Sequence, residues 1–205
     1  ETAEMPKLYR GEDFDMAGFC VGIAEKENLL PKKNINLGDC IIGLSSNGLH
    51  SNGYSLINHM IEKRKIKVND KINQENLGNL LIKPTKIYTE ILNIKSFGKI
   101  KAIANITGGG LTENIPRILP KNKSGLIDFK KLKMPKLFSY IQDKGNIENK
   151  EMLKVLNCGI GMIVICSSEE SSLIMNQLKR KRIKSLVIGE IIKSNGKSLI
   201  KYKNI

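Results

Sequence analysis

Short apolar runs that end in glycine-bearing polar loops constrain this chain more than any other feature. The run Cys40–Leu44 ends in nine residues made mostly of turn formers, 45–53, and a helical pattern follows over Ser55–Arg64. The run Ile100–Ile106 ends in a threonine and three consecutive glycines, and another short helical pattern follows over Leu111–Ile118. A short continuous apolar run bounded by turn residues is typical of a strand buried on both faces. We therefore predict a layered protein in which strands and helices alternate.

The remaining patterns complete an α/β (α+β) fold with a mixed sheet and flanking helices. Further strands are predicted over Phe14–Ala24, Gly125–Phe129 and Met162–Cys166, with a terminal hairpin of Leu186–Ile192 and Leu199–Tyr202 joined across Asn195-Gly196. Further helices are predicted over Pro84–Ser96, Pro135–Lys144, Glu151–Leu156 and Glu169–Lys181. Strands and helices alternate in the middle of the chain and strands pair locally at its end, which favours a mixed sheet.

Composition excludes several functional classes. Apolar residues make up 40% and charged residues 26% of the chain, which is typical of a globular protein rather than a disordered one. No apolar run approaches the ~18–20 residues that span a bilayer, so we expect no membrane partner. The four cysteines, Cys20, Cys40, Cys158 and Cys166, form no C-x-x-C pair. We expect them to be small buried hydrophobic residues in a reducing compartment, with no zinc.

The net charge of +14 suggests nucleic-acid binding, but the residue types do not support it. There are 29 Lys and only 5 Arg, and they accompany 30 Ile and 20 Asn, so a drift in composition explains the charge. Proteins that read bases depend on arginine forks and stacked aromatic rings, whereas this chain has no Trp and 5% aromatic residues. We expect no nucleic-acid partner, although the charge favours anionic small molecules.

Two loops and one acidic segment are candidates for chemistry. The loop Thr107–Gly110 would let a phosphate approach the main chain closely, although a plain tight turn explains three glycines equally well. His50 lies among hydroxyl and amide side chains and could bind a phosphate, transfer a proton or simply organise its own loop. His59 lies in the middle of a helical pattern and is interpreted as structural.

The acidic residues of the first fifteen positions form the third candidate site. Clustered carboxylates suit Mg²⁺, which prefers oxygen ligands and is often shared with substrate phosphates, but a solvated acidic terminus is the alternative. The acidic residues are Glu1, Glu4, Glu12, Asp13 and Asp15.

Six motifs follow one another along the chain. The longest and most specific motif is Thr107–Arg117, which reads TGGGLTENIPR. The other five motifs are Glu1–Pro6, Gly11–Gly18, His50–Ser55, Pro84–Tyr88 and Asn157–Met162. In this order the six motifs resemble the phosphoribosylformylglycinamidine cyclo-ligases, the AIR synthetases of purine biosynthesis, and the resemblance extends over nearly the whole chain.

The resemblance implies a cytoplasmic enzyme that uses ATP and Mg²⁺ to close the imidazole ring of formylglycinamidine ribonucleotide, releasing ADP and phosphate. It also implies a homodimer in the full-length enzyme. Residues 1–36 would be the end of an N-terminal ATP-binding domain with its linker, and residues 37–205 an AIR synthetase-type C-terminal domain. A different hypothesis is a non-catalytic C-terminal module that only folds and binds phosphate-bearing ligands.

The resemblance also suggests roles for single residues. Thr107, Gly108, Gly109 and Gly110 would cradle a phosphate, which Asn114 would orient. His50 and Asn52 would be catalytic and, with Ser51, would contact the reacting phosphoryl group or the substrate. Glu1 and Glu4 would be what remains of a metal site. An added Cβ at Gly109 is expected to hinder phosphate binding and to leave the fold intact.

Overall fold

The computed structural model describes residues 18–30 and 32–205 of the chain, and its centre is a six-stranded mixed sheet. The spatial order of the strands is β4 (Ile100–Asn105), β6 (Ile160–Cys166), β1 (Cys40–Ser45), β7 (Ser185–Lys193), β5 (Lys123–Asp128) and β8 (Ile200–Lys203). Neighbouring strands are antiparallel, except that β8 runs parallel to β5. The predicted mixed sheet with flanking helices is confirmed.

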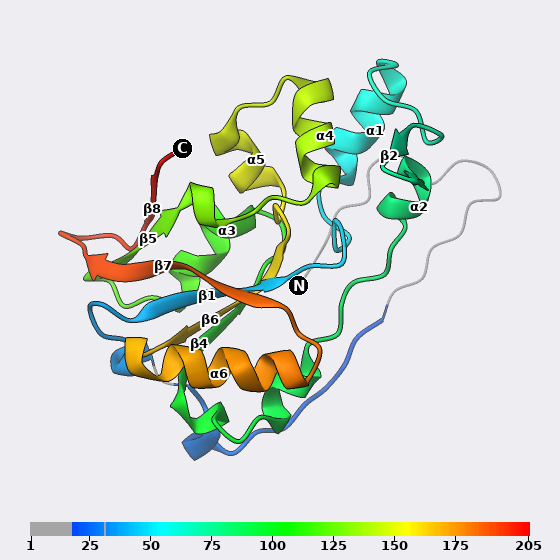
Figure 1. Ribbon diagram of the computed structural model, residues 1–205. Coiled ribbons are helices and arrows are strands. Elements are labelled where there is room, and N and C mark those ends of the chain that lie inside the picture. Colours follow the sequence, from blue (N-terminus) through cyan, green and yellow to red (C-terminus); the bar gives the residue numbers. More distant parts are fainter. Residues whose placement is uncertain (1–17, 31) are drawn as a thin grey trace.

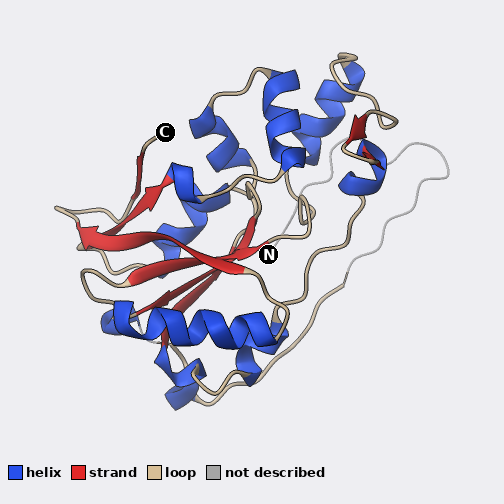
Figure 2. Ribbon diagram, viewed as in Figure 1, coloured by secondary structure: helices blue, strands red, loops and turns tan. Residues whose placement is uncertain are grey.

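Helices cover both faces of this sheet (Figures 1 and 2). On one face lies α6 (Ser168–Arg180), and over the other lie α3 (Gly110–Asn114), α4 (Lys136–Gly145) and α5 (Asn149–Val155). Beside α4 lies a group of small elements: α1 (Tyr54–Glu62), the two-stranded ribbon of β2 (Lys71–Ile72) and β3 (Glu75–Asn76), and α2 (Leu77–Leu81). Short 3₁₀ turns are Lys26–Asn28, Lys32–Asn34, Thr89–Asn93, Phe97–Lys99, Ile115–Ile118 and Phe129–Lys131.

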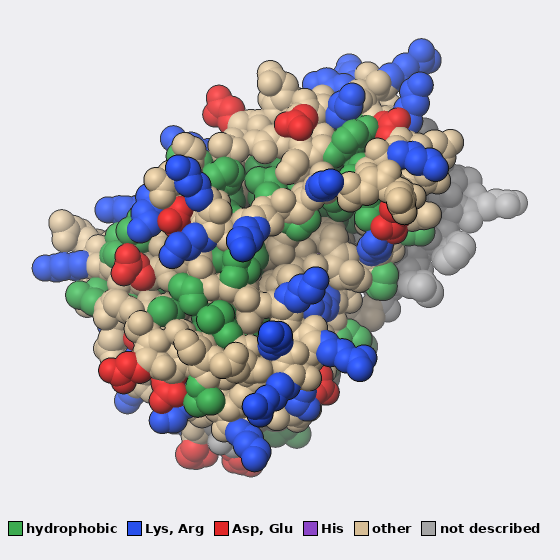
Figure 3. Space-filling view, viewed as in Figure 1, with side chains coloured by type: hydrophobic (Ala, Val, Ile, Leu, Met, Phe, Trp, Pro, Cys, Tyr) green, Lys and Arg blue, Asp and Glu red, His purple; other side chains and the backbone are tan. Residues whose placement is uncertain are grey.

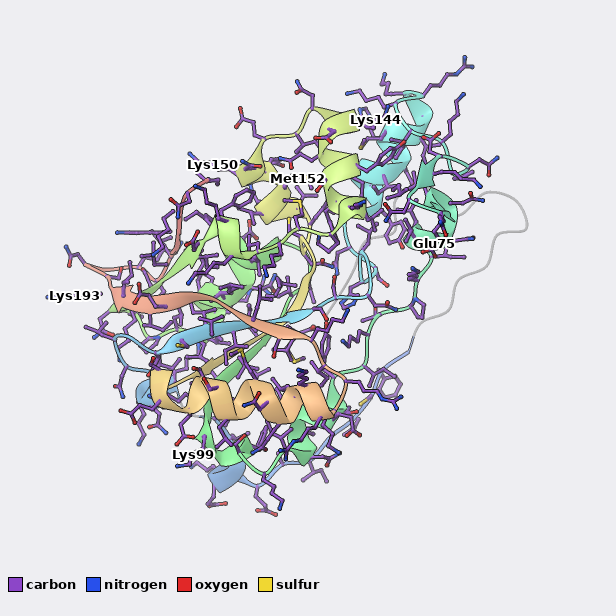
Figure 4. All side chains as sticks on the ribbon, viewed as in Figure 1. Glu75, Lys99, Lys144, Lys150, Met152 and Lys193 are labelled. Atoms are coloured by element: carbon purple, nitrogen blue, oxygen red, sulfur yellow. The ribbon has the colours of Figure 1, made fainter. Side chains whose placement is uncertain are left out.

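The core has two layers because alternate side chains of the central strands point to opposite faces of the sheet. On β1, Ile41 packs in the cluster formed with α3, α4 and α5, whereas Ile42 and Leu44 pack in the cluster formed with α6. Met152 on α5 points into the first of these layers (Figure 4). Both faces of the central strands β1 and β6 are therefore buried, which explains why these two strands are continuously apolar in the sequence.

Three predicted elements differ from the structure. The described part of Phe14–Ala24, residues 18–24, is not a buried strand, because its side chains are exposed and it has no strand partner among the described residues. Within Pro84–Ser96 the chain forms only the 3₁₀ turn Thr89–Asn93. Residues 84–88, which precede this turn, are not helical. Contacts with β1 hold them in place, such as the hydrogen bond that the Tyr88 hydroxyl donates to the Ser45 carbonyl oxygen.

The terminal hairpin is the third wrong prediction. Both of its strands exist, but β5 lies between β7 and β8, so that Gly125 is opposite Ile191 on one side and Ile200 on the other. The turn-forming pair Asn195-Gly196 predicted that β7 and β8 pair with each other, whereas β5, which comes earlier in the sequence, lies between them.

The cysteines follow the prediction in part. Cys158 and Cys166 are buried and Cys40 is half-buried, but Cys20 is exposed because it lies in the uncovered segment 18–24. Burial raises the pKa of the Cys158 thiol to about 12, which makes this sulfur inert. In the described residues, no helix is both long and apolar enough to cross a membrane.

Candidate functional site

Three loops meet at one edge of the sheet. Because β1 and β4 both run antiparallel to β6, their last residues lie beside the first residues of β6. The polar loop (residues 46–53) follows β1, the glycine loop (Thr107–Gly110) follows β4, and residues 156–159 lead into β6. The strand order thus brings together the two loops that the sequence pointed to, which are more than fifty residues apart in the chain.

A buried asparagine holds the polar loop in place. Asn157, 2% exposed, accepts hydrogen bonds at Oδ1 from the Ser46 hydroxyl (3.1 Å) and the Gly159 amide (2.8 Å). Its Nδ2 donates to the carbonyl oxygens of Gly48 (2.8 Å) and Leu49 (3.0 Å). The sequence analysis placed Asn157 in a family motif but gave it no role, because its partners in the polar loop are more than a hundred residues away.

Asn114 plays the same part for the glycine loop. Its buried Nδ2 donates to the carbonyl oxygens of Gly110 (2.9 Å), Gly108 (3.1 Å) and Thr107 (3.3 Å), and its Oδ1 accepts from the Thr107 hydroxyl (3.1 Å). The amide of Asn114 is therefore fully engaged in shaping the loop. This geometry favours a positioning role, and the predicted contact of Asn114 with a phosphate stays a prediction.

The three glycines of this loop have different surroundings. Gly108 is exposed, and an added Cβ there would have only Asn52 Oδ1 near it, at 3.7 Å. Gly109 has φ +92°, and an added Cβ would lie 2.6 Å from Glu113 Oε2. At Gly110, with φ +57°, a Cβ would overlap the carbonyl oxygen of Leu153. Only Gly108 leaves open space in front of the main chain, so the expectation that the fold tolerates a Cβ at Gly109 is not supported.

The His50 side chain is buried within the polar loop. Its side chain is 5% exposed, and Nε2 accepts hydrogen bonds from the backbone amides of Asn47 (2.8 Å) and Lys86 (3.3 Å). Burial, and then the charge of Lys86, lower the pKa of His50. A neutral ring with an accepting Nε2 carries its proton on Nδ1. The arrangement supports the interpretation that His50 organises its loop, and its catalytic role stays a prediction.

The other two candidates of the polar loop are more accessible. Ser51 is exposed with φ 63°, and Asn52 is half-buried with its Nδ2 donating to the His50 carbonyl oxygen at 2.8 Å. Asn52 Oδ1 faces Gly108 across the gap between the two loops. Of the predicted site residues, Asn52 and Gly108 are therefore the pair that the structure brings together next to open space.

The predicted metal ligands Glu1 and Glu4 lie outside the described residues. Over 18–30 and 32–205, no group of three or more His, Cys, Asp or Glu side chains is close enough to hold a metal ion. The described part of the chain thus offers no acidic cluster with which the predicted Mg²⁺ could be matched.

A groove of about 500 Å³ borders the polar loop and was not predicted from the sequence. Its walls are apolar, with Ile72, Leu80 and Leu137 among them, and its rim is polar. On the rim, Lys83 forms a 2.8 Å ion pair with Glu75. Figure 4 labels Glu75 beside α2. Lys136 donates a hydrogen bond to the Asn73 side-chain oxygen at 2.7 Å.

The layered sheet and the loops gathered at one of its edges define a class of α/β domain. The family model for the C-terminal domain of AIR synthase related proteins matches residues 36–201. The chain therefore belongs to this family.

Solved structures with the same fold include two kinds of protein. One is the thiamine-monophosphate kinase from Stenotrophomonas maltophilia K279a, which is 12% identical with a TM-score of 0.55, over 84% of this chain and 52% of that one. The other is E. coli HypE, a hydrogenase maturation protein, which is 12% identical with a TM-score of 0.54, over 86% and 50%. The chain thus spans about half the length of each of these structures, and at this identity the likeness shows the fold alone.

Proposed function

We propose that the whole protein catalyses ATP-dependent ring closure of formylglycinamidine ribonucleotide to 5-aminoimidazole ribonucleotide, with release of ADP and phosphate. The observation that carries the proposal is the eleven-residue segment Thr107–Arg117, which resembles the cyclo-ligases and forms the glycine loop at the edge where the polar loop also lies. Family membership supports the proposal at the level of the superfamily.

The chemistry requires activation of a poor leaving group. The amide oxygen of the substrate attacks the γ-phosphorus of ATP, and ADP leaves. An internal nitrogen then attacks the activated carbon, the C–O bond breaks, and phosphate is released. Mg²⁺, if bound by residues outside the described part, would neutralise phosphate charge. Catalysis of this kind depends on positioning more than on covalent help, and the ring-forming nitrogen is already part of the same molecule.

We assign the positioning of the phosphoryl group to the glycine loop and the polar loop. Asn114 turns the carbonyl oxygens of Thr107, Gly108 and Gly110 towards itself, and Gly108 leaves the outer side of its main chain open. Asn52 faces the same space and can donate to a substrate oxygen after exchanging its bond to His50. His50 and Ser51 shape the loop that carries Asn52.

We assign residues 1–36 to the end of a preceding ATP-binding domain and residues 37–205 to the C-terminal domain, and we propose that the full-length enzyme is a cytoplasmic homodimer.

Gly108→Ala in the full-length protein tests the phosphate cradle. The variant should keep the thermal midpoint of the parent, because a Cβ at Gly108 meets only one side-chain atom at van der Waals distance. It should nevertheless lower ADP release dependent on formylglycinamidine ribonucleotide at least tenfold, because the Cβ occupies the space where a phosphate would approach. A Gly108→Ala enzyme as active as the parent would show that the triple glycine is only a turn. Gly98→Ala, where a Cβ meets nothing within 4 Å, is the control.

The alternative is a non-catalytic module that binds phosphate-bearing ligands. The half-length match to the solved structures is the observation that keeps it open. If the full-length protein binds ATP and the ribonucleotide but releases no ADP above background, the module is the better description.

A further inference from the structure

A second candidate site, which is positively charged, lies at the same edge of the sheet as the glycine loop but apart from it. The ammonium group of Lys86 is half-buried, lies 3.4 Å from the Ser45 hydroxyl and is 5.7 Å from the centre of the Tyr88 ring. No ion pair joins it to a carboxylate of the described residues. A half-buried ammonium group is normally paired, because burial without a counter-charge is costly.

Lys184 adds a second positive charge at this place. It precedes β7, and its carbonyl oxygen accepts the Ser45 amide at 2.9 Å, so its backbone is fixed beside Ser45. Burial, and then the positive charge of Lys184, lower the pKa of Lys86. Lysine side chains outnumber acidic ones over much of the visible surface, but most of them point away from the molecule, as Lys193 does at the end of β7 (Figures 3 and 4).

The groups around the Lys86 ammonium are held in place by hydrogen bonds of their own. Tyr88 is buried and donates from its hydroxyl to the Ser45 carbonyl oxygen at 2.7 Å, which fixes the ring beneath the ammonium group. His50 is tied to the Lys86 amide and lies edge-on to the Tyr88 ring, with 6.1 Å between the ring centres. Lys86 and Lys184 therefore form a positive site on a rigid base, with the Ser45 hydroxyl as an additional donor.

The ligand that suits this site is a dianionic phosphate group. A phosphate dianion would relieve the repulsion between two lysines and accept hydrogen bonds from both and from the serine hydroxyl. In the sheet order, β6 separates β4, which leads into the glycine loop, from β1, which ends in Ser45. Two strand spacings of about 4.8 Å separate the two places by roughly 10 Å, which is too far for one phosphate to occupy both.

We propose that Lys86, Lys184 and the Ser45 hydroxyl bind the phosphomonoester end of the substrate, apart from the glycine loop. The binding of a phosphate group stands on these contacts alone. Its identification as the substrate's own phosphomonoester rests on the proposed function, in which the glycine loop positions the transferred phosphoryl group.

The test is stabilisation of this chain by ribose 5-phosphate and by inorganic phosphate, at ionic strength held constant with chloride. Both compounds should raise the thermal midpoint of the parent in a saturable way, because a ligand that binds only the folded state stabilises it. Lys86→Met and Lys184→Met should each weaken the apparent affinity at least tenfold. Lys181→Met, which removes the same charge from a lysine paired with Glu90 at 2.8 Å, should bind as the parent does. The midpoints without ligand show whether each variant is folded.

Three results would overturn the proposal: no saturable shift in the parent, unchanged affinity in Lys86→Met, or binding of inorganic phosphate without ribose 5-phosphate. Gly108→Ala separates this proposal from the proposed function. If Gly108→Ala abolishes binding while Lys86→Met retains it, the phosphate binds at the glycine loop, and the phosphate cradle stands without the second site.

Discussion

Two buried asparagines set the shape of the candidate site at the scale of single residues. Asn114 and Asn157 are each less than 4% exposed and have all their hydrogen-bonding groups engaged by loop atoms. Satisfied buried amides contribute modestly to stability, but a buried partner left without its bond costs roughly 1–3 kcal/mol. The shape of both loops therefore depends on two buried amides that are already bonded to loop atoms.

Replacing Asn114 by Asp tests this dependence. The substitution removes the Nδ2 donor and places a carboxylate against three carbonyl oxygens, so we expect the free energy of unfolding to fall by at least about 2 kcal/mol. Urea unfolding measures the loss. Asn105→Asp, at an exposed position two residues before the glycine loop, should change the free energy by less than about 0.5 kcal/mol. Equal effects at the two positions would contradict the interpretation.

Titration of His50 should make the folded protein less stable as the pH becomes acidic. Its pKa is lowered in the folded protein, whereas the unfolded chain titrates near the ordinary value of about 6.5. The unfolded state therefore binds more protons in this window, so stability is fully present above about pH 6.5 and is lost as pH falls towards the folded pKa.

Urea unfolding at pH 7.5 and 5.5 measures the effect of His50. His50→Gln keeps an acceptor for the two amides but does not titrate, so it should lose less stability between these pH values than the parent does. His59→Gln, at an exposed position of α1, should behave as the parent. The interpretation fails if His50→Gln and the parent show the same pH dependence.

Sequence reasoning identified the loops of the site but not how their residues are used. The glycine and polar loops were recognisable because turn formers directly follow apolar runs. The structural role of Asn157 and the roles proposed for Lys86 and Lys184 were not recognisable, because each depends on a partner at a distant place in the sequence. Strand order determines those partners, and no local pattern carries it.

The same reason explains the errors at the scale of elements. The buried strands β1, β4 and β6 and the amphipathic helix α6 were predicted because their patterns depend only on burial. The turn at Asn195-Gly196 correctly separates two strands, but it does not decide which strand each one pairs with. Contacts between β5 and β7 took precedence over local pairing.

The close packing of β5 against β7 at Gly189 can be tested directly. A Cβ at Gly189 would overlap the carbonyl oxygen of Leu126 and lie 3.0 Å from the Cα of Ile127, both backbone atoms of β5. Gly189→Ala should therefore push the strands apart and reduce the free energy of unfolding by about 1–3 kcal/mol, measured by urea unfolding. Gly98→Ala, with no atom near its Cβ, provides the control. Wild-type stability in Gly189→Ala would show that the two strands are less closely packed than the structure has them.

At the scale of the whole molecule, the apolar segment 18–24 is the feature that the rest of the described fold does not cover. Phe19, Val21 and Ile23 are 94%, 84% and 98% exposed, and they occupy alternate positions of a segment that forms neither helix nor strand. Together these three side chains form an exposed apolar strip along the chain. An uncovered strip of this kind promotes self-association.

Replacing Phe19, Val21 and Ile23 together by Ser tests the consequence. Because these side chains contribute almost no buried area, the thermal midpoint should stay that of the parent, while binding of a hydrophobic dye and the apparent mass in light scattering should both fall. A control with Ser at Ile82, Leu92 and Leu199 removes three apolar side chains that are exposed in separate parts of the chain, and it should leave both readouts unchanged. If instead the first variant lowers the thermal midpoint and the control does not, the segment is packed against the domain in solution and the exposed strip does not exist.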